Sequence, residues 1–400
     1  MPPEFLASGV FVDEVSVGST PIPGAPTSIT VFIGWTAKGP VDQALLVTSF
    51  KEFELSYGGL DQRSELSYAI KHFFENGGSR VYLIRIAENS VWTDRLSRGS
   101  EVLKPNTSAF ERHFPEDAAG GVFAQLDKLE SFNILAVPGE TSSAVIARLQ
   151  AYCRKRRAFY IVDSPGNATV ENMTQGPDKE ITGPDAMNSA LYFPWLVAPD
   201  PLQQGKSRHF PPSGFVAGIY ARNDVERGIQ KAPAGVSSAV RGATGVSPDI
   251  TDTECNALSL LGINCIRDLP NGITVWGART LLGGEQMSSE WKYVPVRRLA
   301  LFLEDSIERG LQWAVFEPNG EQLWKKILLQ VDAFLYGLWR EGALQGNTSR
   351  EAYFVKCGSE TMTQNDIDTG RINCLVGIAA VKPAEFVIIR IQLFIGNQQD

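Results

Sequence analysis

The sequence predicts an α/β protein with two or three domains, and three observations favour this class. An apolar run at residues 132–137, a helical pattern and a second apolar run at 158–163 make one strand–helix–strand unit. Two long amphipathic helices are expected near residues 296–310 and 321–340. The chain has 400 residues, 43% hydrophobic and 20% charged, so it is long and apolar enough to bury more than one core.

Residues 1–26 are expected to form an extended N-terminal arm. Residues 8–15 are β-prone, and prolines follow them at positions 21, 23 and 26. Because proline fixes φ and lacks a backbone N–H, the segment 18–26 suits neither a helix nor a central strand. We therefore expect the strand to pair far from its neighbours in the chain. Its apolar positions are Val10, Phe11, Val12 and Val15.

Residues 27–87 are expected to form a compact N-terminal segment. Apolar runs at 29–34 and 80–86 predict two of its strands. The helix between them is expected to start after Ser64, a suitable N-cap, and to end at Gly77, where a left-handed turn costs least.

The periodicity of apolar residues differs between the next two ranges, 88–130 and 131–285. The first range is expected to be an insertion of surface loops, because polar, glycine and proline residues interrupt its periodicity. The second contains the strand–helix–strand unit, whose helix starts at Ser142 or Ser143 and ends in basic residues that suit the helix dipole. Within it, the stretch 188–252 is dense in glycine, proline and serine and is expected to be mostly ordered loop.

The C-terminal part divides into a domain at residues 286–383 and a final strand at 384–400. The helix at 321–340 has a broad apolar face, so it must pack against a large surface. The last segment alternates with a period of two, which places Arg390 and Gln392 opposite its apolar face. The positions of that face are Val387, Ile389, Ile391, Leu393 and Ile395.

The composition disfavours several classes of function. The net charge of −8 and the pI near 5.2 disfavour a nucleic-acid partner. The N-terminus lacks the regions of a signal peptide and no run of 18 apolar residues occurs, so we expect a soluble protein made in the cytosol, without membrane insertion. The five cysteines are odd in number, widely spread and without a CxxC pair, so we expect reduced and mostly buried thiols.

Residues for catalysis, metal binding or cofactor binding are scarce. His72, His113 and His209 are far apart in sequence and lack the spacing of paired ligands, and a structural role is favoured for His72. The turn at 138–143 has no phosphate-loop glycine pattern and carries a glutamate. The basic run 154–157 is interpreted as a solvated helix end rather than an RNA or membrane contact. We therefore expect no enzyme, no metal and no cofactor.

Several motifs along the chain are long enough to make chance similarity a poor explanation. They are GVFVDEV at 9–15, PWL at 194–196, PPSG at 211–214, VAGIYARND at 216–224, RG at 227–228, KAP at 231–233, GIN at 262–264, VWGART at 275–280, YVPVRRL at 293–299, FEPN at 316–319, LWREGAL at 338–344 and MTQNDID at 362–368. These motifs resemble the contractile tail sheath proteins of phage tails, R-type pyocins and extracellular contractile injection systems. The similarity spans most of the chain and is weakest at about 88–125.

The resemblance implies a structural subunit that forms stacked hexameric rings around an inner tube and contracts to drive the tube through a target envelope. Its partners would be further copies of the chain, the inner tube protein, baseplate and terminal cap proteins, and sheath paralogues. Residues 131–285 would form a subtilisin-like α/β layer without a catalytic triad, and residues 286–383 the inner, tube-facing domain. Assembly would take place in the cytoplasm, within a phage-like particle that is then released from the cell.

The family assembles by strand exchange, and this chain has the two parts that such a mechanism needs. We expect the N-terminal and C-terminal strands each to extend a sheet of a neighbouring subunit through the apolar positions given above. The alternative is that both strands fold back onto their own domain. The candidates for contact with the tube are Lys325, Lys326, Asn365 and Asp366. Two other functions remain open: a soluble α/β hydrolase with an unrecognised site, and another baseplate or tail component of the same machine.

Overall fold

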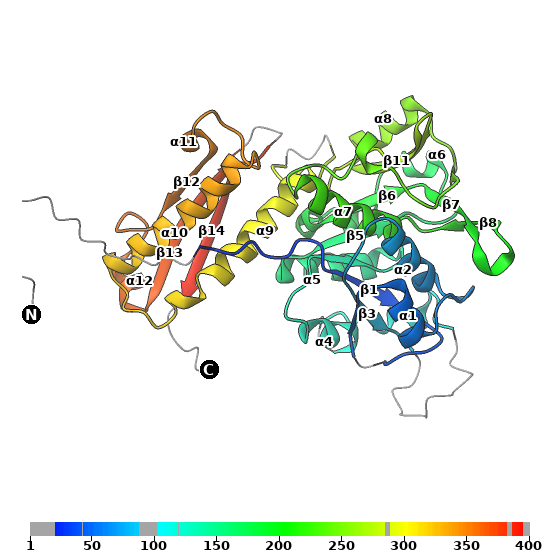
Figure 1. The fold of residues 1–400 in the computed structure, drawn as a ribbon, viewed down its shortest axis with the longest axis horizontal. Helices are drawn as coiled ribbons and strands as arrows, with labels where there is room; N and C mark the ends of the chain where they lie inside the picture. The colour runs from blue at the N-terminus through cyan, green and yellow to red at the C-terminus, as the bar shows by residue number, and fades with distance from the viewer. Residues whose placement is uncertain are drawn as a thin grey trace, which may run out of the picture.

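The computed structural model describes residues 21–41, 43–87, 102–118, 120–284, 289–381 and 386–394, the last range by its backbone alone. These residues form a large lobe and a smaller one, and helix α9 (Val294–Gly310) lies where the two lobes meet (Figure 1). The α/β class predicted from the sequence is confirmed.

The large lobe is built on one eight-stranded sheet with the order β11-β10-β6-β5-β4-β1-β3-β2. The six central strands are parallel, and the two edge strands, β11 and β2, are antiparallel to their neighbours. The strands are β1 (Thr30–Gly34), β2 (Leu45–Val47), β3 (Val81–Arg85), β4 (Ile134–Ala136), β5 (Phe159–Asp163), β6 (Ser189–Phe193), β10 (Ile263–Leu269) and β11 (Gly272–Val275).

Helices cover both faces of this sheet, so the large lobe has three layers. On β1, Phe32 joins the core on the side of α1, α2 and α7, whereas Val31 and Ile33 join the core on the side of α3, α4, α5, α6 and α8. The first group is α1 (Phe50–Tyr57), α2 (Glu65–Glu75) and α7 (Ser213–Arg227). The second is α3 (Ser108–Glu111), α4 (Gly121–Asp127), α5 (Ser143–Arg156), α6 (Val170–Met173) and α8 (Asp252–Leu260).

The sheet joins two ranges that the sequence analysis treats as separate. Strand β1 pairs with β3 from its own segment 27–87 and also with β4 from the segment 131–285. Helix α2 begins after Ser64, whose side chain accepts from Ser67 N, and Gly77 follows it at φ 107°, as predicted. The two ranges therefore contribute to one folded unit.

Two expectations about loops are wrong. Within the described part of 88–130, Phe110, Phe114 and Phe123 are fully buried, and α3 and α4 carry two of them. These helices have four and seven residues, too short for a visible apolar period. The stretch 188–252 contains four strands and α7 rather than mostly loop.

Helix α7 escaped prediction because it is buried almost all round, which leaves no amphipathic stripe to detect. Its glycines allow close packing on α2. A Cβ on Gly214 would lie 2.6 Å from Ala69 Cα, and one on Gly218 would lie 2.5 Å from the Phe73 carbonyl oxygen. The glycines that suggest a loop are therefore the residues that let two helices touch.

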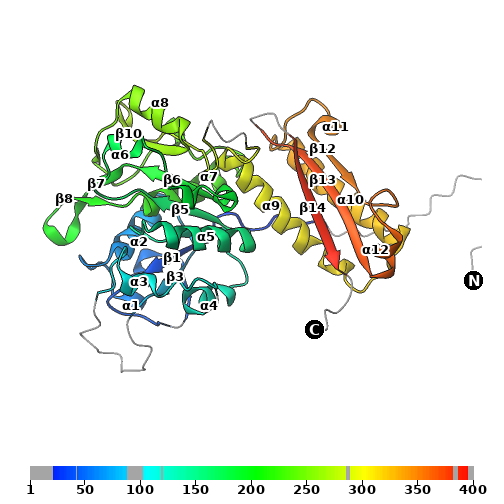
Figure 2. The same ribbon diagram turned by 180° about the vertical axis from the view of Figure 1, so that it is seen from behind.

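A small antiparallel sheet projects from the large lobe. It consists of β7 (Trp195–Asp200), β8 (Lys206–Phe210) and β9 (Gly245–Ser247), with β7 in the middle. The hairpin of β7 and β8 extends on the side of the large lobe away from the small lobe (Figures 1 and 2).

The small lobe packs helices on a three-stranded antiparallel sheet. Strand β13 lies between β12 and β14. Helix α10 packs on one face of this sheet, the face turned toward the viewer in Figure 1. Its own core includes Ile327 of α10, Val376 of β13 and Leu303 of α9. The elements are α10 (Glu321–Arg340), α11 (Ser349–Ala352), α12 (Gln364–Asp368), β12 (Tyr353–Lys356), β13 (Arg371–Ala379) and β14 (Phe386–Phe394).

Candidate assembly surfaces and the joint between the lobes

The C-terminal strand lies in the sheet of its own chain. Strand β14 pairs with β13 along nine residues, from Arg371 opposite Phe394 to Ala379 opposite Phe386. Four predicted apolar positions of β14, Val387, Ile389, Ile391 and Leu393, stand opposite the buried residues Ile378, Val376, Cys374 and Ile372. The alternation that the sequence shows in β14 therefore matches the buried face of β13. Ile395 lies outside the described residues.

The N-terminal arm is described only from residue 21, so Val10, Phe11, Val12 and Val15 lie outside the described residues. The tether that follows them packs on α9. Ile22 and Ala25 are buried, Ala25 N donates to Ser306 Oγ at 2.9 Å, and Ile22 contacts the position of Gly310. From β1 this segment runs toward the small lobe (Figure 1). The described end of the tether therefore lies at the small lobe, where Ile22 joins the core.

A buried ion pair fixes α9 to the large lobe. The guanidinium of Arg298 donates to both carboxylate oxygens of Asp224 on α7, at 2.9 and 2.6 Å, and the two side chains are 3% and 2% exposed. Arg298 also donates to the Thr27 carbonyl oxygen at 3.0 Å and stacks over Tyr220. Burial lowers the pKa of Arg298, but the neighbouring Asp224 carboxylate outweighs burial and leaves the pKa above its ordinary value. This pair joins α7, α9 and the N-terminal tether.

A second contact at the joint uses the preceding arginine. Arg297 donates to Asn188 Oδ1 at 2.7 Å and lies 3.4 Å from Glu304 Oε1. Side chains of α9 enter both cores: Val294 and Leu301 join that of the large lobe, and Leu303 and its neighbours that of the small lobe. The lobes therefore share α9 and are not independent units on a flexible linker.

Three of the four basic residues at the end of α5 are paired with carboxylates. Arg154 lies 2.8 Å from Asp185 Oδ1, and Arg157 contacts Glu304 and Glu308 of α9. These contacts support the interpretation of the run as a helix end and place its last residue at the joint.

Polar residues gather at the carboxyl ends of the parallel strands, where α/β enzymes place their active sites. The Asp163 carboxyl group accepts from Ser213 Oγ at 2.7 Å, from Ser213 N at 2.7 Å and from Gly139 N at 2.9 Å. The hydroxyl of Ser213 thus faces a carboxyl group and not the imidazole that would activate it as a nucleophile. Among the described residues there is no cluster of three or more His, Cys, Asp or Glu side chains arranged to hold a metal.

The histidines take separate positions. His72 is buried, stacks on Phe215 with ring centroids 3.9 Å apart, and lies 3.3 Å from Glu75. His209 lies on the exposed hairpin strand β8. Burial lowers the pKa of His72, which favours a neutral ring packed in the core.

The buried Asp163 carboxyl group should make the free energy of unfolding depend on pH. Burial raises its pKa to about 7, against the opposing effect of the three hydrogen bonds. The folded chain therefore holds a proton that the unfolded chain has lost above about pH 4, so this group's contribution to the free energy of unfolding falls as the pH rises from about 4 to about 7.

We expect that contribution to fall by about 1.4 kcal/mol per pH unit in this range. Urea denaturation of the wild type and of Asp163→Asn across the range measures it, because the difference between the two curves isolates the group. The exposed Asp268→Asn serves as the control. A difference that stays constant with pH would contradict the assignment.

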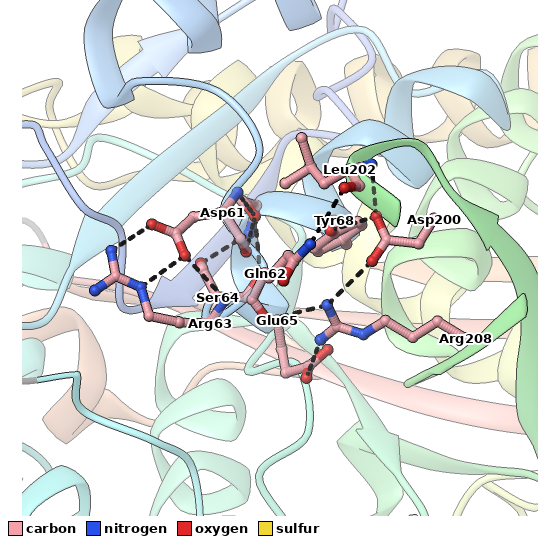
Figure 3. Close-up of polar contacts among 10 residues, drawn as sticks. Asp61, Gln62, Arg63, Ser64, Glu65, Tyr68, Asp200, Leu202 and Arg208 are labelled. Atoms are coloured by element: carbon pink, nitrogen blue, oxygen red, sulfur yellow. Dashed lines mark hydrogen bonds and ion pairs between the residues drawn. The ribbon is translucent and has the colours of Figure 1, made fainter. Parts of the chain in front are cut away.

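A polar network anchors the projecting hairpin to α2 (Figure 3). Arg208 of β8 donates to Glu65 Oε1 at 2.7 Å, lies 3.9 Å from Asp200 Oδ2, and stacks over the ring of Tyr68. The Tyr68 hydroxyl donates to Asp200 Oδ1 at 2.7 Å. Gln62 donates to the Leu202 carbonyl oxygen at the turn. The base of the hairpin is therefore fixed while its tip, residues 202–205, is exposed.

The candidate tube-contact residues lie at one end of the small lobe. Lys325 and Lys326 are exposed in the first turns of α10, and Asn365 and Asp366 belong to α12. Asn319 connects the two elements: its amide donates to the carbonyl oxygens of Ile367 and Arg371, at 3.4 and 3.3 Å. Asp366 also caps its own helix by accepting from the backbone N–H and hydroxyl of Thr363.

The buried pair of Arg298 and Asp224 was absent from the sequence analysis. Both residues lie inside motifs that resemble tail sheath proteins, YVPVRRL and VAGIYARND. The available signal was two arginines within an otherwise uncharged run, residues 294–303, because a charge there is costly to bury unless it finds a partner.

Comparison with known proteins agrees with this architecture. Residues 119–281 match the model of the phage tail sheath protein central domain, and residues 286–394 match that of the phage tail sheath C-terminal domain. A putative prophage major tail sheath protein of Pseudomonas aeruginosa (strain UCBPP-PA14) is 24% identical over 96% of this chain and 96% of its own length.

Two solved structures are similar along nearly the whole chain. The helical sheath of the anti-feeding prophage in its contracted state has a TM-score of 0.73 and 28% identity, covering 96% of this chain and 98% of that one. The contracted sheath complex of the extracellular contractile injection system PVC has a TM-score of 0.70 and 27% identity, covering 97% and 98%. No helix of the described residues combines the length and apolar character needed to cross a bilayer. The chain belongs to the phage tail sheath family and is a structural component of a phage-like contractile injection system.

Proposed function

We propose that the chain polymerises into stacked hexameric rings around an inner tube and contracts to drive that tube through a target envelope. The observation that supports this most is the likeness, over 96% of the chain, to a helical sheath in its contracted state. Assembly in the cytoplasm, with release of the particle from the cell, and contact with an inner tube, a baseplate, a terminal cap and sheath paralogues are part of the same proposal.

Strand exchange would link the copies. The pairing of β13 with β14 specifies register and alternation but not which copy supplies β14, so a neighbour's strand can satisfy the same positions. The N-terminal strand would extend a small-lobe sheet of another copy, a proposal that the position of the described end of the tether, beside the small lobe, supports. Exchange also covers edges that would otherwise pair unselectively.

Contraction would move each subunit about these terminal strands. The shared helix α9 and its buried pair keep the two lobes of one subunit together, so the pivots lie in the chain termini. The free energy would come from tighter packing and larger buried area in the contracted state, stored when the sheath assembles. We interpret the layer of 131–285 as subtilisin-like in topology and without hydrolytic function, since Ser213 is bound to Asp163.

Negative-stain electron microscopy of the purified full chain tests the proposal directly. We expect hollow cylinders with a six-fold repeat. A chain that stays monomeric at high concentration, by analytical ultracentrifugation, would contradict polymerisation.

Tube contact is tested by reversing charges on α10. The double substitution Lys325→Glu, Lys326→Glu should lower the recovery of tube in co-sedimented sheaths, because each exposed ion pair contributes roughly 1 kcal/mol and the loss repeats in every copy. Cylinders without tube should still form. The matched control reverses the exposed Lys51 and Lys128 of the large lobe and should leave tube recovery unchanged. Equal recovery with both variants would remove α10 from the tube interface.

A further inference from the structure

Two cysteines of the small lobe, Cys357 and Cys374, lie opposite each other where β12 and β13 pair. The antiparallel pairing of β12 with β13 ends with Lys356 opposite Leu375, so the next pair along the ladder is Cys357 opposite Cys374. Both residues are buried, at 3% and 1% exposure, in the core of the small lobe. The neighbouring Cys374 thiol raises the pKa of Cys357.

This placement suits a disulfide bond. Residues directly opposite each other in an antiparallel pair have Cβ atoms about 4.5 to 5.5 Å apart. A disulfide needs Cβ atoms about 3.5 to 4.5 Å apart, with Cα atoms about 4.4 to 6.8 Å apart. The ladder therefore brings the two residues to the edge of bonding range, and a small shift of strand β12 closes the remaining gap.

The two cysteines stand at the neck of the loop that carries α12. Strand β12 ends at Lys356, one residue before Cys357, and β13 begins at Arg371 and contains Cys374, so the loop with α12 lies between the two cysteines. Inside the neck, Thr361 Oγ1 donates to the Asn373 carbonyl oxygen at 2.7 Å, and Asn373 N donates to Met362 Sδ at 3.2 Å. Only non-covalent contacts hold the neck when the cysteines are reduced.

We propose that Cys357 and Cys374 are a dithiol pair that oxidises to a cross-strand disulfide and thereby locks the neck of the α12 loop. The pair is reduced in this structure, and all five cysteines are free thiols. The lock goes beyond the sheath function, because it concerns the redox state of a loop and not the assembly of the chain.

The reaction needs a low-molecular-weight disulfide as the oxidant. One cysteine thiolate attacks that disulfide, forms a mixed disulfide and releases one small thiol. The second cysteine then attacks the mixed disulfide, which forms the bond between the two sulfur atoms and releases the second small thiol. Two thiol protons leave the protein, and its two electrons reduce the oxidant to two thiols.

Burial makes this exchange slow. The neighbouring Cys374 thiol, and to a smaller extent burial, raise the pKa of Cys357. The thiolate form that reacts is therefore scarce at neutral pH. The cytosolic pool of thiols would keep a chain reduced during its synthesis, whereas a long-lived particle in an oxidising environment would have time to oxidise. The disulfide would therefore form gradually in an oxidising environment, unlike the disulfide of a catalytic redox site.

The test uses the purified wild-type chain, incubated natively with oxidised glutathione or with a reducing agent. After rapid alkylation under denaturing conditions, peptide mapping by mass spectrometry assigns every cysteine. We expect one peptide pair joined through Cys357 and Cys374, at low protein concentration and in the monomer. Cys153, which is fully buried with no thiol partner among the described residues, is the internal control and should remain alkylated as a thiol.

Thermal unfolding supplies a second measurement. The oxidised wild type should melt at a higher temperature than the reduced one, because the bond closes a loop in the unfolded chain. Cys374→Ala should abolish both the joined peptides and the difference in melting temperature. The proposal is overturned if Cys357 and Cys374 remain thiols under oxidant while the chain stays folded, or if they bond only to other cysteines or to glutathione.

Discussion

Deletion of residues 1–17 should leave a folded chain that no longer assembles. The strand expected at residues 8–15 would offer about four backbone hydrogen bonds to a neighbouring sheet, each worth about 1 kcal/mol, so its loss should weaken association at least about a hundredfold. The fold should survive because the tether, with Ile22 and Ala25 packed on α9, begins after the cut.

Sedimentation velocity and electron microscopy measure this loss of assembly, and circular dichroism with urea denaturation checks the fold. Deletion of residues 1–7 is the matched control, because it shortens the same arm and keeps the strand; it should still form cylinders. Sheaths formed by the longer deletion would show that the N-terminal arm is not an exchanged strand.

Asp224→Ala should destabilise the folded chain by about 3 to 5 kcal/mol, since it leaves the Arg298 guanidinium buried without its carboxylate. The guanidinium would keep only its bond to the Thr27 carbonyl oxygen and its stacking on Tyr220. The midpoint of urea denaturation, with an unchanged slope, measures the loss.

Two controls separate this effect from general damage. Asp224→Leu combined with Arg298→Met removes both charges and should recover most of the lost stability, because an apolar pair of similar volume replaces a buried ion pair at little cost. Glu321→Ala breaks an ion pair in which both side chains are 75% exposed, and should cost at most about 1 kcal/mol. A loss below that of Glu321→Ala would mean that the buried pair does not hold the joint.

The joint also contacts the tether that precedes β1. Arg298 contacts α7 and the tether that leads to the N-terminal arm, so one side chain connects the large lobe to the proposed exchange site. Weakening it with Asp224→Asn should loosen the contacts of α9 with both α7 and the tether. The hairpin of β7 and β8 extends on the other side of the large lobe (Figure 1) and should be unaffected.

The sequence predicted elements wherever a periodic pattern was long. Helix α10 spans Glu321–Arg340 as expected, and the final strand expected within 384–400 corresponds to β14, Phe386–Phe394. The family was also predictable, because its motifs are distributed along the chain and do not depend on any one element. Short or fully buried elements such as α3 and α7 were missed, since neither shows an apolar period.

Sequence by itself thus determined the α/β class, the long helices, the alternation of the last strand and the family. Only the tertiary structure decided that β1 sits between β3 and β4, that Arg298 meets Asp224, 74 residues away, and that Cys357 lies opposite Cys374. The reason is physical. Periodicity records whether a position faces a core or solvent, whereas partners across a core are chosen by strand order and register, which no single segment encodes.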